Sequence, residues 1–355
     1  MNEFRIFSLL ISLVICLGIL TSCGGLDKSD NSKEEVSKIT EQSMSDSDES
    51  VILNNTDSES SSENSENDVT SDITPAMWLV TSPQGNKMVC LGSMHALTYK
   101  DYPLPDEITD AFNNADVLAV ECDITEKNNL AEQFALLKSA TLTGNDEAAN
   151  HMSEEAYEIL SKRLAEFNIS IEALKKYKPW FLQNTYESLI QMNSGLNAEL
   201  GIDLWLLKQA HSSGKEIYEV EDYDFQIDLL TNMPDETYDL MFRALEGETK
   251  KSQIQALKNM YEVWRAGNFE KLESMAIDVD YGDMTDKDIE IYERYNAQMI
   301  TERNKTMAEA GKKLLGEGKN VFFAVGAAHY AGEKGIINLL KADGYTCERI
   351  EYKQK

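Results

Sequence analysis

Residues 321–329 read Val-Phe-Phe-Ala-Val-Gly-Ala-Ala-His. The first five are apolar and rich in β-branched and aromatic side chains, a run typical of a strand buried on both faces of a parallel sheet. Gly326 follows at once, and glycine permits a tight exit of the chain from the strand. His329 stands three residues beyond it. Because ligands of open α/β sheets bind outside the carboxyl ends of the strands, His329 is predicted to lie at such an edge.

The same pattern stands near the other end of the folded region. Residues 87–91 (KMVCL) are predicted to form a strand, and Gly92-Ser93-Met94-His95 follows it directly. A third apolar strand, residues 116–121 (DVLAVE), ends on an acidic residue. The chain has only four histidines, and two of them stand in this motif. If the three strands are neighbours, His95, Glu121 and His329 converge on one spot.

The rest of the folded region predicts strands at both ends and helices between them. Residues 126–315 have a largely helical pattern. The other expected elements are a strand at 77–81, a turn at 82–86, a short helix capped by Asp106, a helix at 202–211, a strand at 216–221, a helix at 333–341 and a strand at 345–350.

This order of elements predicts an α/β fold. Its central sheet is mixed and mostly parallel, is formed by the N- and C-terminal parts of the domain, and carries a large helical insertion. Residues 76–355 form the folded region, whose length suits one large domain or one domain with a sizeable insertion.

The N-terminus has the features of an export signal. Residues 6–20 are almost wholly apolar, a run as long as a signal-peptide core and too short to span a bilayer. Leu20-Thr21-Ser22-Cys23 then resembles the lipobox of bacterial lipoproteins. Residues 1–22 are therefore predicted to be a signal peptide, with a diacylglycerol on Cys23 that holds the protein at the bacterial cell envelope. An ordinary secretory signal is the alternative.

Residues 23–75 are predicted to be a disordered, acidic tether. From residue 24 onward they carry 14 Asp or Glu, three Lys and no aromatic residue. Such a segment buries too little apolar surface to offset its chain entropy. An acidic ligand-binding tail is the alternative. The whole chain has a net charge of −29, which argues against nucleic acid as a partner and leaves the lipid anchor as the expected membrane contact.

Two imidazoles and one carboxylate form a common divalent-metal set that leaves positions open for water and substrate. A single Gly-x-x-His is a weak signal, whereas two at strand exits with an acidic third residue are stronger. Other hydrolase motifs are absent from the sequence: it contains no His-Glu-x-x-His, Gly-x-Ser-x-Gly or Walker-type loop.

Nearly the whole of residues 76–355 resembles the TraB/GumN family, which includes the TraB pheromone-shutdown proteins and the animal TIKI proteases. The motifs that carry the resemblance are LGSMH at 91–95, the segment 102–123 with Glu121, Lys178-Pro179-Trp180, the segment 201–226, Glu302-Arg303-Asn304 and the segment 321–345. The resemblance implies a divalent-metal hydrolase with a fold related to erythromycin esterase and ChaN. Metal-dependent peptidase activity belongs to the TIKI branch.

The resemblance also implies roles for single residues. His95 and His329 would ligate one divalent ion, with Mn or Co favoured over Zn. Glu121 would be the third ligand or the general base, and both roles stay open. Ser93 would hydrogen-bond near the metal or substrate. Arg303 would steady an oxyanion or pair with a glutamate, unless it forms only a surface salt bridge.

Further residues are candidates with weaker support. Gly92 and Gly326 are the motif glycines. Glu221, Gln226 and Tyr330 are possible substrate contacts, although aromatic packing is the simpler role for Tyr330. At 220–222 the chain has Val-Glu-Asp where many members have Leu-Glu-Thr, which puts any substrate contact at 222 in doubt.

Three functions are consistent with the sequence. The first is a surface-tethered metallohydrolase, a peptidase whose metal-activated water attacks an amide carbonyl. The second is a non-catalytic binder of a peptide or small ligand. The third is a metal-free, esterase-like hydrolase in which a histidine acts as general base.

Overall fold

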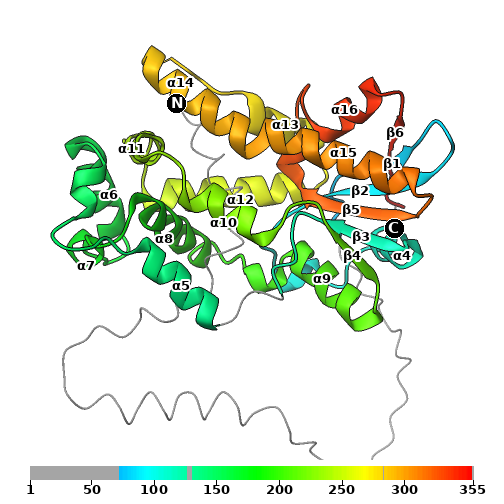
Figure 1. The fold of residues 1–355 in the computed structure, drawn as a ribbon, viewed down its shortest axis with the longest axis horizontal. Coiled ribbons are helices and arrows are strands. Elements are labelled where there is room, and N and C mark those ends of the chain that lie inside the picture. Colours follow the sequence, from blue (N-terminus) through cyan, green and yellow to red (C-terminus); the bar gives the residue numbers. More distant parts are fainter. Residues whose placement is uncertain (1–71, 126–129, 283, 354–355) are drawn as a thin grey trace, which may run out of the picture. The chain divides into compact units, whose positions relative to one another are not determined.

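The computed structural model describes residues 72–125, 130–282 and 284–353. Six strands form one sheet in the order β4-β3-β5-β2-β1-β6 (Figure 1). The strands are β1 (Met77–Thr81), β2 (Lys87–Ser93), β3 (Val117–Val120), β4 (Glu216–Glu219), β5 (Val321–Gly326) and β6 (Thr346–Arg349). The four strands β2, β5, β3 and β4 run parallel, and β1 is antiparallel to both β2 and β6. The predicted mixed, mostly parallel sheet is confirmed.

β5 comes from the C-terminal part of the chain and lies between β2 and β3 from the N-terminal part. In this register Gly92 is paired with Val325 and Ser93 with Gly326, while Val120 is paired with Ala324. The two Gly-x-x-His motifs and Glu121 therefore leave the sheet at the same edge.

Helices cover both faces of the sheet (Figure 1). Successive side chains of a strand point to opposite faces of the sheet. Phe322 and Phe323 accordingly belong to two different hydrophobic clusters, one on each face. Phe323 packs with α15 (Glu302–Gly316) and α16 (Ile336–Ala342). Phe322 packs with α4 (Asp106–Asn114) and α9 (Ile202–Ser213). Both phenylalanines are fully buried, and each such burial stabilises the fold by roughly 1.5–3 kcal/mol.

Between β3 and β5 the chain is almost entirely helical apart from β4, which confirms the predicted insertion. Besides α9 and α15, its helices are α5 (Leu130–Ala140), α6 (Glu154–Ala165), α7 (Ile171–Leu174), α8 (Pro179–Met192), α10 (Tyr223–Thr231), α11 (Asp235–Arg243), α12 (Lys250–Arg265), α13 (Phe269–Ile277) and α14 (Asp286–Asn296). Short turns of 3₁₀-helix are η1 (Tyr99–Asp101), η2 (Ala148–His151), η3 (Ala198–Leu200) and η5 (Ala327–Tyr330), and η4 (Ala297–Thr301) is a π-helix.

Several predicted element ends differ from the structure: the strand expected at 216–221 ends at Glu219, and the strand expected at 345–350 is Thr346–Arg349. Two helix starts also differ. Pro105 is the N-cap of α4, and Asp106 is the first helical residue instead of the cap. The helix expected at 333–341 begins at Ile336, with Gly335 as its N-cap. A Cβ at Gly335 would overlap the carbonyl oxygens of Tyr330 and Ala331, so the chain passes too close to η5 for the helix to start earlier.

The packed domain begins by Ile73, ahead of the boundary at 76. Ile73 is fully buried, and the Thr74 amide donates to the carbonyl of Arg265 (2.8 Å). The predicted signal peptide, Cys23 and the tether up to residue 71 lie outside the described residues.

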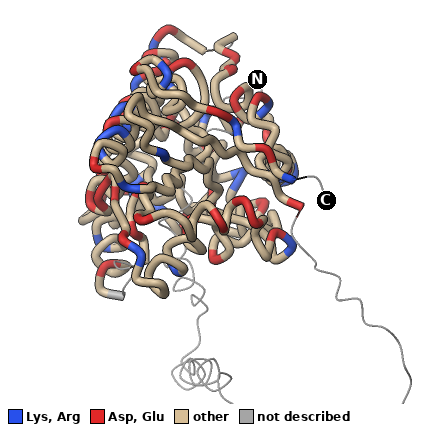
Figure 2. Tube along the Cα trace, turned by 90° about the vertical axis from the view of Figure 1, so that its right-hand side faces the viewer, with Lys and Arg blue, Asp and Glu red and all other residues tan. Residues whose placement is uncertain are grey.

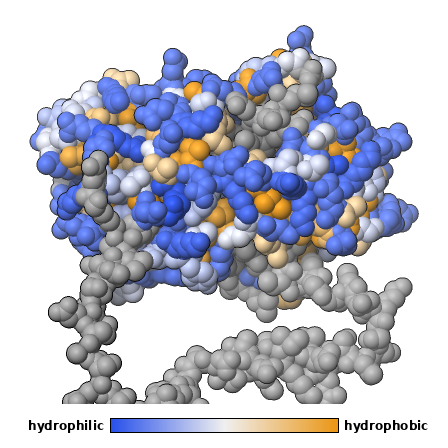
Figure 3. Space-filling view, turned by 180° about the vertical axis from the view of Figure 1, so that it is seen from behind, coloured by the Kyte–Doolittle hydropathy of each residue, from blue (hydrophilic) through white to orange (hydrophobic). Residues whose placement is uncertain are grey.

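Charged residues of both signs are spread over the described region, with Asp and Glu interspersed among Lys and Arg (Figure 2). The face opposite to that of Figure 1 is mostly hydrophilic, with hydrophobic residues in small patches (Figure 3). Within the described ranges, no helix is both long and apolar enough to cross a membrane.

Candidate active site

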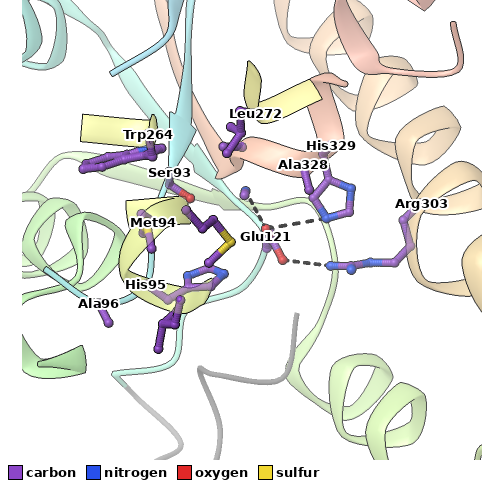
Figure 4. Close-up of a pocket in the computed structure, with 14 residues that line it drawn as sticks. Ser93, Met94, His95, Ala96, Glu121, Trp264, Leu272, Arg303, Ala328 and His329 are labelled. Atoms are coloured by element: carbon purple, nitrogen blue, oxygen red, sulfur yellow. Dashed lines mark hydrogen bonds and ion pairs between the residues drawn. The ribbon is translucent and has the colours of Figure 1, made fainter. Parts of the chain in front are cut away.

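A cavity of about 40 Å³ lies where β2, β3 and β5 end (Figure 4). Its polar lining comes from residues that the sequence analysis singled out, namely Ser93, His95, Glu121, Arg303 and His329. A water molecule needs roughly 10–15 Å³ of such space, so the cavity has room for more than one small group.

Three of these side chains surround one point beside Gly326. A Cβ at this glycine would lie 3.2 Å from Glu121 Oε1, 3.5 Å from His329 Cδ2 and 3.9 Å from His95 Nε2. A Cβ at Gly92 would similarly lie 3.1 Å from the Cβ of Ala327. Neither glycine has a positive φ, so the motif glycines are needed for close approach and not for an unusual backbone conformation.

His95 is held by the start of α9. Its Nδ1 lies 2.8 Å from Asp203 Oδ2, and the Ile202 amide donates to the carbonyl of Met94 (3.1 Å). Because the carboxylate accepts the proton of Nδ1, the other ring nitrogen, Nε2, is directed to the cavity. Burial alone would lower the pKa of His95, but the Asp203 carboxylate outweighs it and raises the pKa to about 9.

His329 is held by a neutral side chain. Its Nδ1 lies 2.6 Å from Asn304 Oδ1, and Asn304 Nδ2 donates to the carbonyl of Lys334 (2.9 Å). That second bond fixes the amide with its oxygen toward the imidazole, so Nδ1 carries the proton and Nε2 has a free lone pair. Burial, followed by the nearby Arg303 charge, lowers the pKa of His329 to about 3.

Glu121 has hydrogen bonds at both carboxylate oxygens. Oε1 accepts from the Gly326 amide (2.7 Å) and lies 3.8 Å from His329 Nε2. Oε2 accepts from Arg303 Nη2 (2.8 Å) and from Gln226 Nε2 (3.2 Å). Burial would raise the pKa of Glu121, but the Arg303 guanidinium and both imidazoles outweigh it and lower the pKa to about 2.

Arg303 is buried and joins two glutamates. Its Nε donates to Glu221 Oε1 (2.7 Å), and its Nη2 donates to Glu221 Oε2 and to Glu121 Oε2 (both 2.8 Å). Its Nη1 donates to the carbonyl of Met299 in the π-helix η4 (3.0 Å). Only 4% of the arginine is exposed. Arg303 therefore forms the expected pairs with glutamates, and these ion pairs are buried and not at the surface.

The three residues predicted as possible substrate contacts, Glu221, Gln226 and Tyr330, lie outside the lining of the cavity. Glu221 and Gln226 are buried behind Glu121, and Gln226 donates to both glutamates while accepting from the Cys122 thiol. Tyr330 stacks on Trp78 with ring centroids 4.9 Å apart and donates its hydroxyl proton to the Phe323 carbonyl. Within the described lining of the cavity, none of the three takes part.

Ser93 is the unsatisfied group of the site. Its side chain lines the cavity and is buried, and its hydroxyl has no hydrogen-bond partner among the described residues. A buried hydroxyl without a partner costs roughly 1–3 kcal/mol. Ser93 is thus available to a group bound in the cavity.

Two residues that orient the imidazoles were missed by the sequence analysis. Asp203 lies in the segment 201–226 and Asn304 in the Glu-Arg-Asn motif, so both stand inside stretches that carry the family resemblance. The sequence also gave no signal for an apolar side of the cavity, which α12 and α13 supply through Leu257, Met260, Trp264 and Leu272.

The donor types at the site fit a divalent cation. Two Nε2 atoms with fixed Nδ1 partners and one carboxylate are donor types that Mn, Co, Fe or Zn sites use. In their present positions, however, no three or more His, Cys, Asp or Glu side chains of the described residues form a group that could hold a metal ion.

Curated proteins of two kinds are similar to this chain. The uncharacterized protein YbaP of Escherichia coli K12 is 28% identical over 156 residues, which is 44% of this chain and 56% of YbaP. A metalloprotease TIKI homolog of Amphimedon queenslandica is 23% identical over 199 residues, or 52% of this chain and 39% of that protein. The chain thus spans only part of these relatives.

No solved structure matches the chain. The match to a family model is much longer than the matches to single relatives and covers residues 76–349, from β1 to the last residue of β6. It includes both Gly-x-x-His motifs, Glu121 and Arg303. The chain therefore belongs to the TraB/PrgY/gumN family.

Proposed function

We propose that this protein is a divalent-metal-dependent hydrolase that cleaves peptides at the bacterial cell envelope, where a lipid on Cys23 anchors it. The observation that carries the proposal is the pair of imidazoles whose Nδ1 atoms are held by Asp203 and Asn304 and whose Nε2 atoms face the same cavity as Glu121. The similarity to a metalloprotease TIKI homolog supports the same reaction class.

His95, His329 and Glu121 would hold the ion, and the bound ion supplies positive charge and an acidified water. Glu121 acts as a ligand in this proposal and not as the general base. A carboxyl whose pKa is held at about 2 is a weak proton acceptor near neutral pH. Arg303 keeps Glu121 ionised and fixed in place, because the positive guanidinium pairs directly with the Glu121 carboxylate. Glu221 holds the same guanidinium from its other side.

Ser93 would contact the substrate. Its hydroxyl is free to donate to the carbonyl oxygen of a bound peptide, which removes the cost of an unsatisfied buried group.

A non-catalytic binder is the second candidate. It is favoured by the full set of hydrogen bonds at Glu121 and by the open arrangement of the three donors in the described part of the chain. The metal-free hydrolase has less support. A general base works best with a pKa near 7, whereas the pKa of His95 is about 9 and that of His329 is about 3.

Elemental analysis of the purified full chain, combined with turnover of a peptide library, tests the proposal. We expect a bound divalent ion and turnover in the wild type, with both lost in His95→Ala and His329→Ala. His151→Ala is the matched control, because His151 lies in η2 outside the cavity lining. Glu121→Gln should also lose the ion.

Wild-type metal content in both His95→Ala and His329→Ala would refute the metal site. Tight binding of peptides without turnover, in protein loaded with Mn or Co, would leave the non-catalytic binder as the function.

A further inference from the structure

The cavity has two chemically different sides. The polar side consists of Ser93, His95, Glu121, Arg303 and His329. The opposite side, which we call the apolar wall, consists of Leu257, Met260 and Trp264 from α12 and Leu272 from α13. Figure 4 shows Trp264 on the far side of Glu121 from Arg303. All four wall residues are at most 4% exposed, so the wall is part of the packed core.

The helix geometry explains why α12 presents these side chains together. Leu257, Met260 and Trp264 have the spacing i, i+3 and i+7, which places them on one helical face. The indole N–H of Trp264 donates to the carbonyl of Gly92 (2.8 Å). Because that polar atom is already paired, the wall presents only carbon and sulfur to the cavity.

The charges at the site are also paired. Arg303 in the described lining is paired with two carboxylates, and the His95 imidazole is paired with the Asp203 carboxylate. An acidic side chain of a substrate would therefore lose its water shell beside the apolar wall without gaining a free cation. Such desolvation of a charge is costly unless it is compensated, whereas a hydrocarbon side chain is stabilised when it leaves water for an apolar surface.

We propose that the apolar wall is a specificity pocket that receives an uncharged, aliphatic or thioether side chain of the peptide substrate, next to the bond that reacts. The inference rests on the proposed function for its substrate, a peptide. At roughly 10–15 Å³ for each water-sized group, the cavity of about 40 Å³ has room for about three or four such groups, similar to the non-hydrogen atoms of a Leu or Met side chain. The flexible Met260 can adjust to either.

Binding of short peptides tests the pocket without relying on turnover. The probes are Gly-Gly-Xaa-Gly-Gly peptides, acetylated and amidated at their ends, with Leu, Ala or Asp as Xaa, titrated calorimetrically into the metal-free full-length protein. We expect the Leu peptide to bind at least about tenfold more tightly than the Ala or Asp peptide. Equal affinities, or no binding of any probe, would overturn the pocket.

A cavity-filling variant gives a test that does not depend on stability. Leu272→Phe narrows the pocket, so within the same variant the preference should move from the Leu peptide toward the Ala peptide. The matched control is Leu229→Phe on α10, since Leu229 is similarly buried (6% exposed) but does not line the cavity. An unchanged Leu-to-Ala ratio in Leu272→Phe would contradict the inference.

Hydrolysis of the same three peptides by metal-loaded protein separates this inference from the proposed function. Preferential binding of the Leu peptide with no cleavage would refute the hydrolase and support the pocket. Cleavage of all three peptides at equal rates would support the hydrolase and refute the pocket.

Discussion

His95 and His329 stand in matching motifs, yet their Nδ1 partners differ in charge. Asp203 presents a carboxylate at 2.8 Å and Asn304 an amide oxygen at 2.6 Å. Both partners fix the imidazole so that Nε2 faces the cavity, but only Asp203 adds negative charge beside it. Oriented ligands of this kind depend on the groups behind them.

Asp203→Ala should weaken Mn binding by roughly 10–100-fold, because His95 loses the group that orients its ring. Metal titration followed by calorimetry measures the change, and circular dichroism checks the fold. Asp146→Ala is the matched control, since Asp146 pairs with His151 and not with His95. Unchanged Mn affinity in Asp203→Ala would show that the carboxylate does not position the ring.

Arg303→Gln should destabilise the fold by about 3–5 kcal/mol, because Glu121 and Glu221 lose the buried cation that compensates them. Chemical denaturation measures the free energy of unfolding. Arg294→Gln serves as the control: this arginine pairs with Glu236 at the surface, where such a pair contributes only ~0–1 kcal/mol. Similar losses in the two variants would refute a special role for the buried cluster.

At the scale of elements, the loop after β2 is held in place from several sides. Leu97 exchanges backbone hydrogen bonds with Asn197. Asp101, which is fully buried, accepts from the hydroxyl of Tyr261 and from Nε of Arg265, both on α12. The loop that carries His95 is thus tied to the insertion at two places, Asn197 and α12.

Gly201→Ala should disturb this arrangement, because a Cβ there would overlap the carbonyl oxygen of His95. Overpacking of this kind costs about 1–3 kcal/mol, which denaturant unfolding measures, and we expect weaker Mn binding as well. Gly316→Ala is the opposite case: it lies on α15 with no atom within 4 Å of the new Cβ. It should stabilise the helix by up to ~1 kcal/mol.

His151 links two elements of the insertion in a pH-dependent way. It lies in η2, and its two ring nitrogens contact Asp146 (2.9 Å) and Asp235 (2.7 Å), the latter at the start of α11. Hydrogen bonds to these two carboxylates, Asp146 first, raise the pKa of His151 above its usual value. The stabilisation that protonated His151 gives to the folded state is therefore complete below the unfolded-state pKa of about 6.5. It is lost as the pH rises through the raised pKa.

The expected result is that His151→Gln lowers the free energy of unfolding more at about pH 5.5 than at about pH 9. Urea denaturation of both proteins at each pH measures the difference. An equal effect at both pH values would mean that the charged imidazole does not stabilise the contact between η2 and α11.

At the scale of the whole molecule, the proposed lipid anchor would hold the candidate active site at the membrane surface. Cys23→Ala should leave the protein without lipid and remove it from the membrane fraction, because a diacyl chain is the expected attachment. Metabolic labelling with a fatty acid, followed by fractionation, measures both effects. Label that remains on the alanine variant would place the lipid elsewhere or exclude this anchor.

Much of the sheet could be predicted because its signals are local. Apolar runs such as 321–325 encode buried strands, and glycine and histidine directly after them mark the exits. The residues of one motif are neighbours in the chain, so the candidate donors His95, Glu121 and His329 were also readable from the sequence. Element ends were less accurate, as Asp106 and Gly335 show. Pro105 and not Asp106 caps α4, and Gly335 caps α16 where the chain passes close to the carbonyl oxygens of Tyr330 and Ala331.

The sequence by itself therefore determined the fold class, and it predicted the candidate site residues His95, Glu121 and His329. Only the tertiary structure decided that β5 lies between β2 and β3, which brings residues more than 200 positions apart to one edge. The burial of Arg303 between two glutamates, the partners of each imidazole and the apolar wall from α12 and α13 likewise depend on that assembly. The physical reason is the same for all three features: each arises from contacts between segments far apart in the chain, and no local sequence pattern shows which distant segments will meet.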